Sequence, residues 1–162
     1  MRPNQLFAAM KPERARAFLD ALKEQAPIAW AQAIGLTAGA IKARPVFVQK
    51  QPPERRAELI RKALSRVASS PIAEELLAVY FLECRNELLV EWLDAVGVEH
   101  DQGTLTGDPK EPDADALRRA VEAFRKAGDD EAARADRELL LRAFTAQTSI
   151  DWPTLDALLA AS

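Results

Sequence analysis

The sequence predicts an all-α protein in which six to seven helices pair as antiparallel hairpins, forming a helical bundle or a short solenoid-like stack. Three observations lead to this prediction. Apolar residues recur with helical spacing through most of the 162 residues. Prolines, glycines and aspartates stand where such helices would begin or end. Strand-like sequence is confined to residues 98–105, which could close a small β-hairpin.

The predicted organisation is a single helical domain over residues 1–162, a length that suits one domain. Its parts are an N-terminal helical pair at 1–43, a connector at 44–53, a central hairpin at 54–97, a loop at 98–112, and a C-terminal helical hairpin with a short last helix at 113–160.

Prolines mark the starts of the first two predicted helices. Pro12 precedes "ERARAFLDALKEQ" and Pro27 opens "IAWAQAIGLTAG". A proline in the first turn loses no helical hydrogen bond. The second helix lies in an uncharged run, residues 25–41, which we interpret as a buried core helix. Gly35 and Gly39 are spaced there to let another helix approach closely, although either could equally end the helix.

The middle of the chain predicts a connector followed by two helices. Three prolines, with Val46 and Val48, favour an extended connector. A third helix follows at "PPERRAELIRKALSRVA", and a fourth is expected to run without interruption from about Pro71 to about Val96. Only about three residues join these two helices, so they are expected to form an antiparallel hairpin.

Acidic caps and a glycine define the C-terminal helices. Asp113 is expected to cap a helix that Gly128 ends, Asp129 to cap the next one, and Asp151 to cap a last short helix. Residues 120–144 resemble one tetratricopeptide-type hairpin in their Ala and Phe positions and "AGD" turn. The resemblance covers about 25 residues, does not recur at the expected period, and lacks that motif's Trp and Gly, so it implies a helix hairpin only.

Charge is distributed unevenly along the chain, although its formal net value is only -3. Residues 1–80 hold 13 basic and 7 acidic residues, whereas residues 81–162 hold 9 and 18. The first part therefore carries +6 and the second -9. Such a split is typical of a basic binding surface, or of two halves that attract each other.

The composition also bears on compartment and chemistry. One cysteine excludes an intrachain disulfide, and neither a signal-peptide pattern nor a membrane-length apolar run is present. We therefore expect a cytoplasmic protein without membrane association. Phosphate-binding glycine loops, a nucleophile elbow and zinc-ligand spacing are missing from the sequence. The sequence thus predicts no cofactor and no metal, and it favours a non-enzymatic role over an enzymatic one.

The fourth predicted helix carries an acidic stripe made of Glu83, Glu87, Glu91 and Asp94. Like charges four residues apart destabilise a helix by a few tenths of a kcal/mol, so a cationic neighbour is expected. The preceding helix offers one, because three basic residues share a face there. We expect interhelical ion pairs with that set, Arg55, Lys62 and Arg66.

Arg85 falls on the apolar side of the same helix and lacks an acidic residue three or four positions away. The structural interpretation is a buried salt bridge to an acid elsewhere, such as one on the fifth or sixth predicted helix. The functional interpretation is a site for a small anionic ligand, formed by Arg85, Glu83 and Glu87, because arginine grips carboxylate and phosphate groups in a bidentate manner.

Two further groups have both a structural and a chemical interpretation. Cys84 is expected to be a small core residue rather than a nucleophile, because the only histidine, His100, lies far along the sequence. Glu99, His100 and Asp101 are metal-capable, but consecutive residues rarely converge on one ion. A solvated hairpin tip is the expected structure there.

A basic segment, residues 42–66, is the candidate nucleic-acid surface. Phe47 is its only aromatic residue, which disfavours stacking on single strands. The candidate phosphate-binding residues are Lys42, Arg44, Lys50, Arg55, Arg56, Lys62 and Arg66.

Three functional hypotheses follow, from different classes. The first is a protein–protein interaction or self-assembly module, whose partner is another protein or a second copy joined head to tail through the oppositely charged halves. The alternative is a nucleic-acid-associated protein that uses the basic segment. The second alternative is a small anionic-ligand binder or enzyme centred on Arg85.

Overall fold

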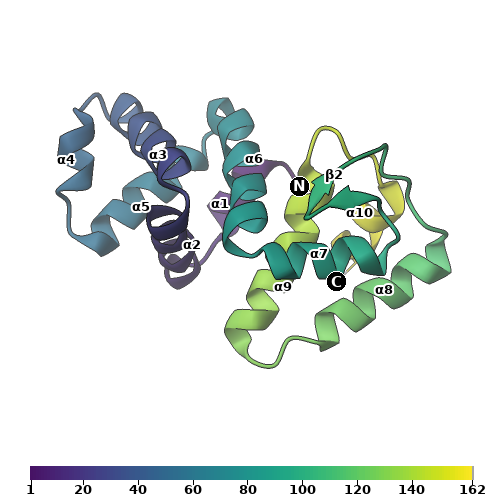
Figure 1. Cartoon of the computed structure of the whole chain (residues 1–162). Coiled ribbons are helices and arrows are strands. Elements are labelled where there is room, and N and C mark those ends of the chain that lie inside the picture. Colours follow the sequence, from purple (N-terminus) through teal and green to yellow (C-terminus); the bar gives the residue numbers. More distant parts are fainter. Residues whose placement is uncertain (162) are drawn as a thin grey trace. The chain divides into compact units, whose positions relative to one another are not determined.

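The computed structural model describes residues 1–161, and these form ten α-helices and one small β-hairpin (Figure 1). The predicted all-α class is therefore confirmed, although the number and arrangement of helices differ from the prediction. The chain divides into two compact units, Met1–Cys84 and a second that begins at Arg85. The single domain predicted over residues 1–162 stays a prediction.

The first unit begins five of its helices on a proline, whose fixed φ suits the first helical position. Its elements are α1 (Pro3–Ala9), α2 (Pro12–Gln25), α3 (Pro27–Ala40), α4 (Pro45–Gln49), α5 (Pro53–Leu64), the 3-10 turn η1 (Val67–Ser69), α6 (Ser70–Val79) and the π-helical turn η2 (Tyr80–Cys84). The two predicted N-terminal helices correspond to α2 and α3.

Two helices of this unit were not predicted. α1 precedes the first predicted helix, and α4 lies inside the segment expected to be an extended connector, so that expectation is wrong. Pro45 sets the first turn of α4, and Val48 is fully buried. Burial of Val48 against the rest of the unit outweighs the strand preference of a β-branched residue.

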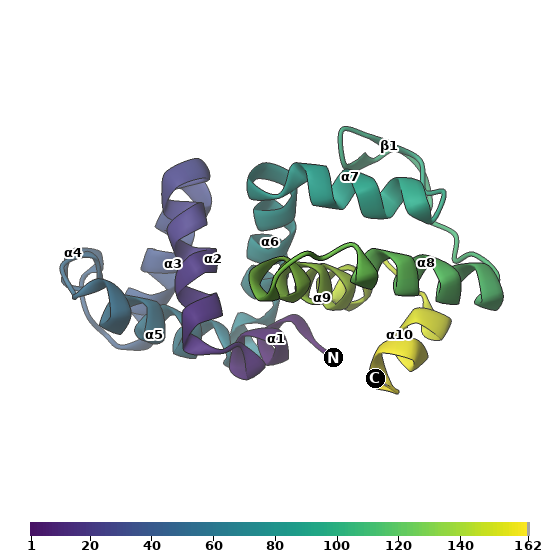
Figure 2. The ribbon, with the colours of Figure 1, turned by 90° about the horizontal axis from the view of Figure 1, so that it is seen from below.

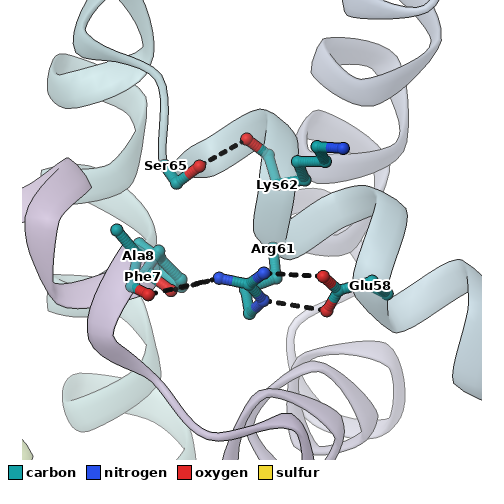
Figure 3. Close-up of polar contacts among 6 residues, drawn as sticks. All are labelled: Phe7, Ala8, Glu58, Arg61, Lys62 and Ser65. Atoms are coloured by element: carbon teal, nitrogen blue, oxygen red, sulfur yellow. Dashed lines mark hydrogen bonds and ion pairs between the residues drawn. The ribbon is translucent and has the colours of Figure 1, made fainter.

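α1 lies beside α5 and α6 (Figure 2), and Arg61 of α5 ties it in place. Figure 3 shows the Arg61 guanidinium between α1 and Glu58. It donates to the Phe7 and Ala8 carbonyl oxygens at 3.1 and 3.4 Å, and to both Glu58 oxygens at 2.6 and 2.9 Å. Those carbonyls lie in the last turn of α1, where Phe7 also accepts from the Met10 amide at 3.3 Å, so Arg61 adds a side-chain cap to this C-terminus.

An aromatic cluster forms the centre of the first unit. Phe18 of α2 packs edge-on against Phe7 of α1, with ring centroids 5.3 Å apart, and against Tyr80 at 4.4 Å. Tyr80 in turn contacts Phe81 at 4.9 Å. All four rings are buried. Because they come from α1, α2 and η2, the cluster joins the beginning of the unit to its end.

The uninterrupted helix predicted from Pro71 to Val96 is wrong. α6 widens into the π-turn at residues 80–84, Arg85 leaves the helical region with φ -136° and ψ 45°, and α7 (Asn86–Ala95) begins afterwards. The apolar period continues across this point, so the periodicity of the sequence did not reveal the break. The second arm of the predicted central hairpin is therefore two helices, and α5 packs chiefly against α2 and α3.

The second unit begins with α7 and continues through the predicted β-hairpin. Its other elements are β1 (His100–Asp101), β2 (Thr104–Leu105), α8 (Ala114–Lys126), α9 (Glu131–Ala146) and α10 (Pro153–Ala160). The strands are antiparallel, with His100 opposite Leu105. Gln102 and Gly103 both have positive φ, 53° and 95°, which is the geometry of a tight two-residue hairpin turn.

The helix caps of this unit follow the prediction in part. The Asp113 side chain accepts from the Ala116 amide at 3.0 Å, as expected. The cap of α9 is Asp130 rather than Asp129, with the Ala133 amide at 2.8 Å. Asp151 does not cap α10, because that helix begins after Trp152.

A carboxylate from the loop before α8 caps α10 in place of Asp151. Glu111 accepts from the amides of Thr154 at 3.0 Å and Leu155 at 3.2 Å. The Trp152 indole N–H donates to the Pro109 carbonyl at 2.9 Å. Residues 109–111 therefore hold the start of α10.

A second aromatic cluster forms the core of this unit. Trp92 of α7 lies 5.3 Å from Phe124 of α8 and 6.0 Å from Phe144 of α9, between ring centroids. Phe144 packs edge-on against Trp152 at 4.8 Å. α8 and α9 form the predicted hairpin (Figure 1), and the cluster joins both of them to α7 and α10.

Candidate interaction surface

Arg85 has the kind of partner that the sequence predicted. Its Nε donates to Asp136 Oδ2 at 3.0 Å, and Asp136 belongs to α9, which corresponds to the sixth predicted helix. The Asp136 side chain is only 12% exposed and that of Arg85 is 37% exposed. The pair thus joins the start of α7 to α9 within the second unit.

The two glutamates grouped with Arg85 are both exposed. Glu83 lies in the π-turn of the first unit, whereas Glu87 lies in the first turn of α7. Their joint assignment with Arg85 to a small anionic ligand stays a prediction, and the geometry adds no observation in its favour.

The ion pairs expected between the acidic stripe and the basic face of α5 stay a prediction. Glu91 accepts from Arg137 of α9, and Arg55 Nε donates to the Gln51 side chain at 3.0 Å. Arg137 also donates to the Phe124 carbonyl at 2.9 Å and lies over the Phe124 ring. Glu91 of the acidic stripe thus has a cationic partner within the second unit.

Cys84 and His100 both make contacts within the fold. Cys84 is buried, with its Sγ 3.6 Å from the Ala21 carbonyl oxygen, as expected of a core residue. His100 Nε2 lies 2.7 Å from Asp94 Oδ1, and its Nδ1 accepts from the Gly103 amide at 3.0 Å. In the described part of the chain, no three His, Cys, Asp or Glu side chains converge to hold a metal ion.

The basic segment presents most of its cations to solvent. The exposed members are Lys42, Arg44, Lys50, Arg55, Lys62 and Arg66. Arg56 is half-buried, because it donates to the Gln49 carbonyl at 3.2 Å and lies 5.2 Å from the centre of the Trp30 ring. The sequence did not predict this aromatic contact, since Trp30 is far from Arg56 along the chain.

A hollow lies between α2 and α5 in the first unit. Its volume is about 510 Å³, and its wall includes the acidic residues Glu13, Asp20, Glu54 and Glu58. Arg16 crosses it, 3.5 Å from Asp20 and 3.7 Å from Glu54. Glu54 is 89% exposed, so the hollow is an open groove with an internal ion pair rather than an enclosed pocket.

The solvent-facing side of α3 lacks charged residues, as the buried side of a helix ordinarily does. We call this side the α3 face and define it as Ile28, Ala31, Gln32, Gly35 and Gly39, all of them exposed. Ile28 is 81% exposed. A surface helix ordinarily turns charged residues outward, but no charged residue occurs between positions 25 and 41.

The expectation of a fully buried core helix at residues 25–41 is therefore only half right. Ala33, Ile34 and Thr37 are buried on the inner side, while the α3 face is not covered by its own unit. The spacing of Gly35 and Gly39 permits another helix to approach closely, but no helix does so in the described chain. A Cβ added at either glycine would meet nothing within 4 Å.

A smaller apolar group lies on and before α4, which packs against α3 (Figure 1). We call it the α4 cluster: Ile41, Val46 and Phe47, which are 39%, 48% and 47% exposed. Val48 anchors this short helix from its inner side. The first unit thus presents two separate apolar surfaces beside its exposed cations.

No protein-family model, curated protein or solved structure matches this chain. Among the residues that the structure describes, no helix combines the length and the apolar character that crossing a membrane requires.

Proposed function

We propose that this chain is a protein-interaction module that docks a protein partner through the α3 face. The supporting observation is the uncharged, solvent-facing side of α3 between Ile28 and Gly39. Apolar surface in contact with water favours association, and a contiguous patch of it is a common mark of an interaction site.

The magnitudes agree with a binding role. Complete burial of one large aliphatic side chain contributes about 1.5–3 kcal/mol, and Ile28 is nearly free of contacts in its own unit. Ala31, Gly35 and Gly39 add little area, but they let a partner backbone come close. A partner helix laid along α3 would therefore gain both burial of Ile28 and close packing over its neighbours.

A photo-crosslinking experiment on the full chain tests this proposal. A photoreactive phenylalanine analogue replaces Gln32 at the centre of the α3 face, and in a matched control it replaces Ala17, which is exposed on α2. We expect a discrete protein adduct from position 32 but not from position 17, with its identity read by mass spectrometry. Equal labelling at both positions, or none at position 32, contradicts the proposal.

Nucleic-acid binding by the basic segment is the second candidate. The observation that favours it is the half-buried Trp30 beneath Arg56, whose guanidinium also donates to the Gln49 carbonyl beside the exposed Lys50. Proteins commonly bind single-stranded nucleic acid by stacking its bases on aromatic rings and pairing its phosphates with cations. Fluorescence anisotropy with labelled oligonucleotides at about 50 mM salt tests this, since phosphate contacts are strongest there. Absence of binding at that salt, or binding that Lys42→Glu leaves unchanged, removes this candidate.

A further inference from the structure

We infer that the occupant of the α3 face is the same face of a second copy of this chain. Two α3 helices would lie antiparallel about a two-fold axis that crosses the α3 face between Gln32 and Gly35, at the level of the midpoint of residues 33 and 34. This inference rests on the proposed interaction function and deepens it by naming the partner. Charge and the order of large and small residues along α3 carry it.

Absence of charge is the first requirement for such a contact. In a two-fold interface each residue near the axis meets its own copy, so any charge there would meet a like charge. The α3 face holds only aliphatic residues, glycines and one amide, Gln32. Gln32 is uncharged, so its two copies, one on either side of the axis, do not repel each other.

In an antiparallel pair of α3 helices, the larger side chains of one copy lie opposite the glycines of the other. In the antiparallel register centred between positions 33 and 34, Ile28 of one copy lies opposite Gly39 of the other, and Gln32 lies opposite Gly35. Each larger side chain thus faces a glycine with open space above it. This alternation lets the side chains of one helix fill the gaps on the other.

The charges that flank the face also match in this orientation. Glu24 lies in the last turn of α2, three residues before α3 begins, and Lys42 lies two residues after α3 ends; both are exposed. Antiparallel pairing brings the N-terminal end of one face to the C-terminal end of the other. Each Glu24 would then lie near Lys42 of the partner copy, and the two helix dipoles would be opposed favourably.

The size of the face predicts a weak dimer. α3 has 14 residues, so the face is about 21 Å long. One helix–helix contact of that length buries less than the roughly 1,200 Å² of a stable standard interface. We therefore expect a concentration-dependent equilibrium between monomer and dimer.

Sedimentation equilibrium of the full chain over a wide concentration series measures this equilibrium. Gly35→Lys places like charges across the axis, and we expect it to weaken dimerisation at least ~10-fold while far-UV circular dichroism stays unchanged. Ala17→Lys adds the same charge at an exposed position of α2, with Glu13 four residues before it, and serves as the control. We expect the control to dimerise like the parent chain.

Disulfide trapping tests the orientation separately. In the antiparallel register positions 28 and 28 of the two copies are about 16 Å apart, too far for a disulfide, whereas positions 28 and 39 are opposite. A mixture of Ile28→Cys and Gly39→Cys chains should form a mixed disulfide dimer on mild oxidation, and Ile28→Cys alone should not. The unsubstituted chain, whose Cys84 is buried, is the blank.

The outcomes separate this inference from the proposed function. A monomer at every concentration, or a disulfide between two Ile28→Cys chains, overturns the antiparallel self-contact. An adduct with a different protein from position 32 would at the same time keep the interaction function. Failure to dimerise, together with no adduct at position 32, removes both.

Discussion

Arg85 and Asp136 form one of the contacts that join the start of α7 to α9. Asp136→Asn removes the charge from a carboxylate that is only 12% exposed. Because hydrogen bonds to charged groups contribute about 1.5–3 kcal/mol, we expect a loss of free energy of unfolding in that range. Urea denaturation of the full chain measures it.

A surface pair gives the matched control for that change. Asp115 and Arg118 are 3.2 Å apart, but their side chains are 75% and 55% exposed. Exposed pairs contribute about 0–1 kcal/mol, so Asp115→Asn should change stability much less than Asp136→Asn. Similar losses from both substitutions would contradict the structural role given to Arg85.

Glu58 makes the stability of the first unit sensitive to acid. Its hydrogen bond from Arg61 lowers the pKa of the carboxyl below the usual 4.5, and the same contact raises the pKa of Arg61. A lowered folded pKa stabilises the protein above pH 4.5, and this stabilisation is lost as the pH falls through the folded value. The Glu58 side chain is half exposed, so the effect is at most about 1 kcal/mol.

The substitution Glu58→Gln isolates this contribution. It should lower the free energy of unfolding at pH 7 and leave it nearly unchanged well below the folded pKa, where the parent carboxyl is already protonated. Urea denaturation of both chains at several pH values measures the difference. An equal loss at neutral and acid pH would show that packing, rather than charge, determines the effect.

At the scale of single elements, two glycines predict opposite responses to alanine. Gly35 lies inside α3 with open space around it, so Gly35→Ala should stabilise the fold by about 0.5–1 kcal/mol. Gly128 lies between α8 and α9, where an added Cβ would be 2.8 Å from Arg134 Cγ and 3.1 Å from the Arg134 amide nitrogen. Gly128→Ala should destabilise by about 1–3 kcal/mol.

Thermal unfolding of the two alanine variants beside the parent checks this pair of predictions. A melting temperature above that of the parent for Gly128→Ala would mean that the turn between α8 and α9 tolerates a side chain. A lower one for Gly35→Ala, measured at a concentration where the chain is monomeric, would mean that the chain's own residues cover that position of α3.

The sequence was informative where single residues have strong local preferences. Prolines located the starts of α2, α3 and α5, and Asp113 located the start of α8. These signals act over one helical turn, so they can be read without knowing the fold.

Features that depend on distant residues were not predictable in the same way. Val48 reads as an extended residue until its burial is known, and Glu111 caps a helix that begins 42 positions later. The α3 face was hidden for a related reason. An uncharged helix predicts burial, and only the packing of its neighbours shows that one side is left uncovered.

At the scale of the whole molecule, the uneven charge follows the division into units. Residues 1–84 hold 13 basic and 8 acidic residues, and residues 85–162 hold 9 and 17, so the units carry +5 and -8. These values sum to the net charge of -3. Two modes of self-association are therefore conceivable, through the uncharged α3 face or head to tail through opposite charges.

Salt distinguishes the two modes. Contact through the α3 face buries apolar groups, so raising salt from about 50 to 500 mM should change its dimerisation constant by less than ~3-fold. Head-to-tail pairing of oppositely charged units should weaken strongly over the same range, because the Debye length shortens. Sedimentation equilibrium at both salt concentrations makes the comparison, and strong weakening of the dimer would contradict the α3 contact.

The Glu111 cap of α10 also has a consequence for the order of events during synthesis. Its partner amide, that of Thr154, lies 43 residues further along the chain. At 5–20 residues per second a ribosome takes roughly 2–9 s to cover that distance. Throughout that interval the Glu111 carboxylate is in a nascent chain that does not yet contain its partner amides in α10. The first unit is by then fully translated, so the two units become able to fold at different times.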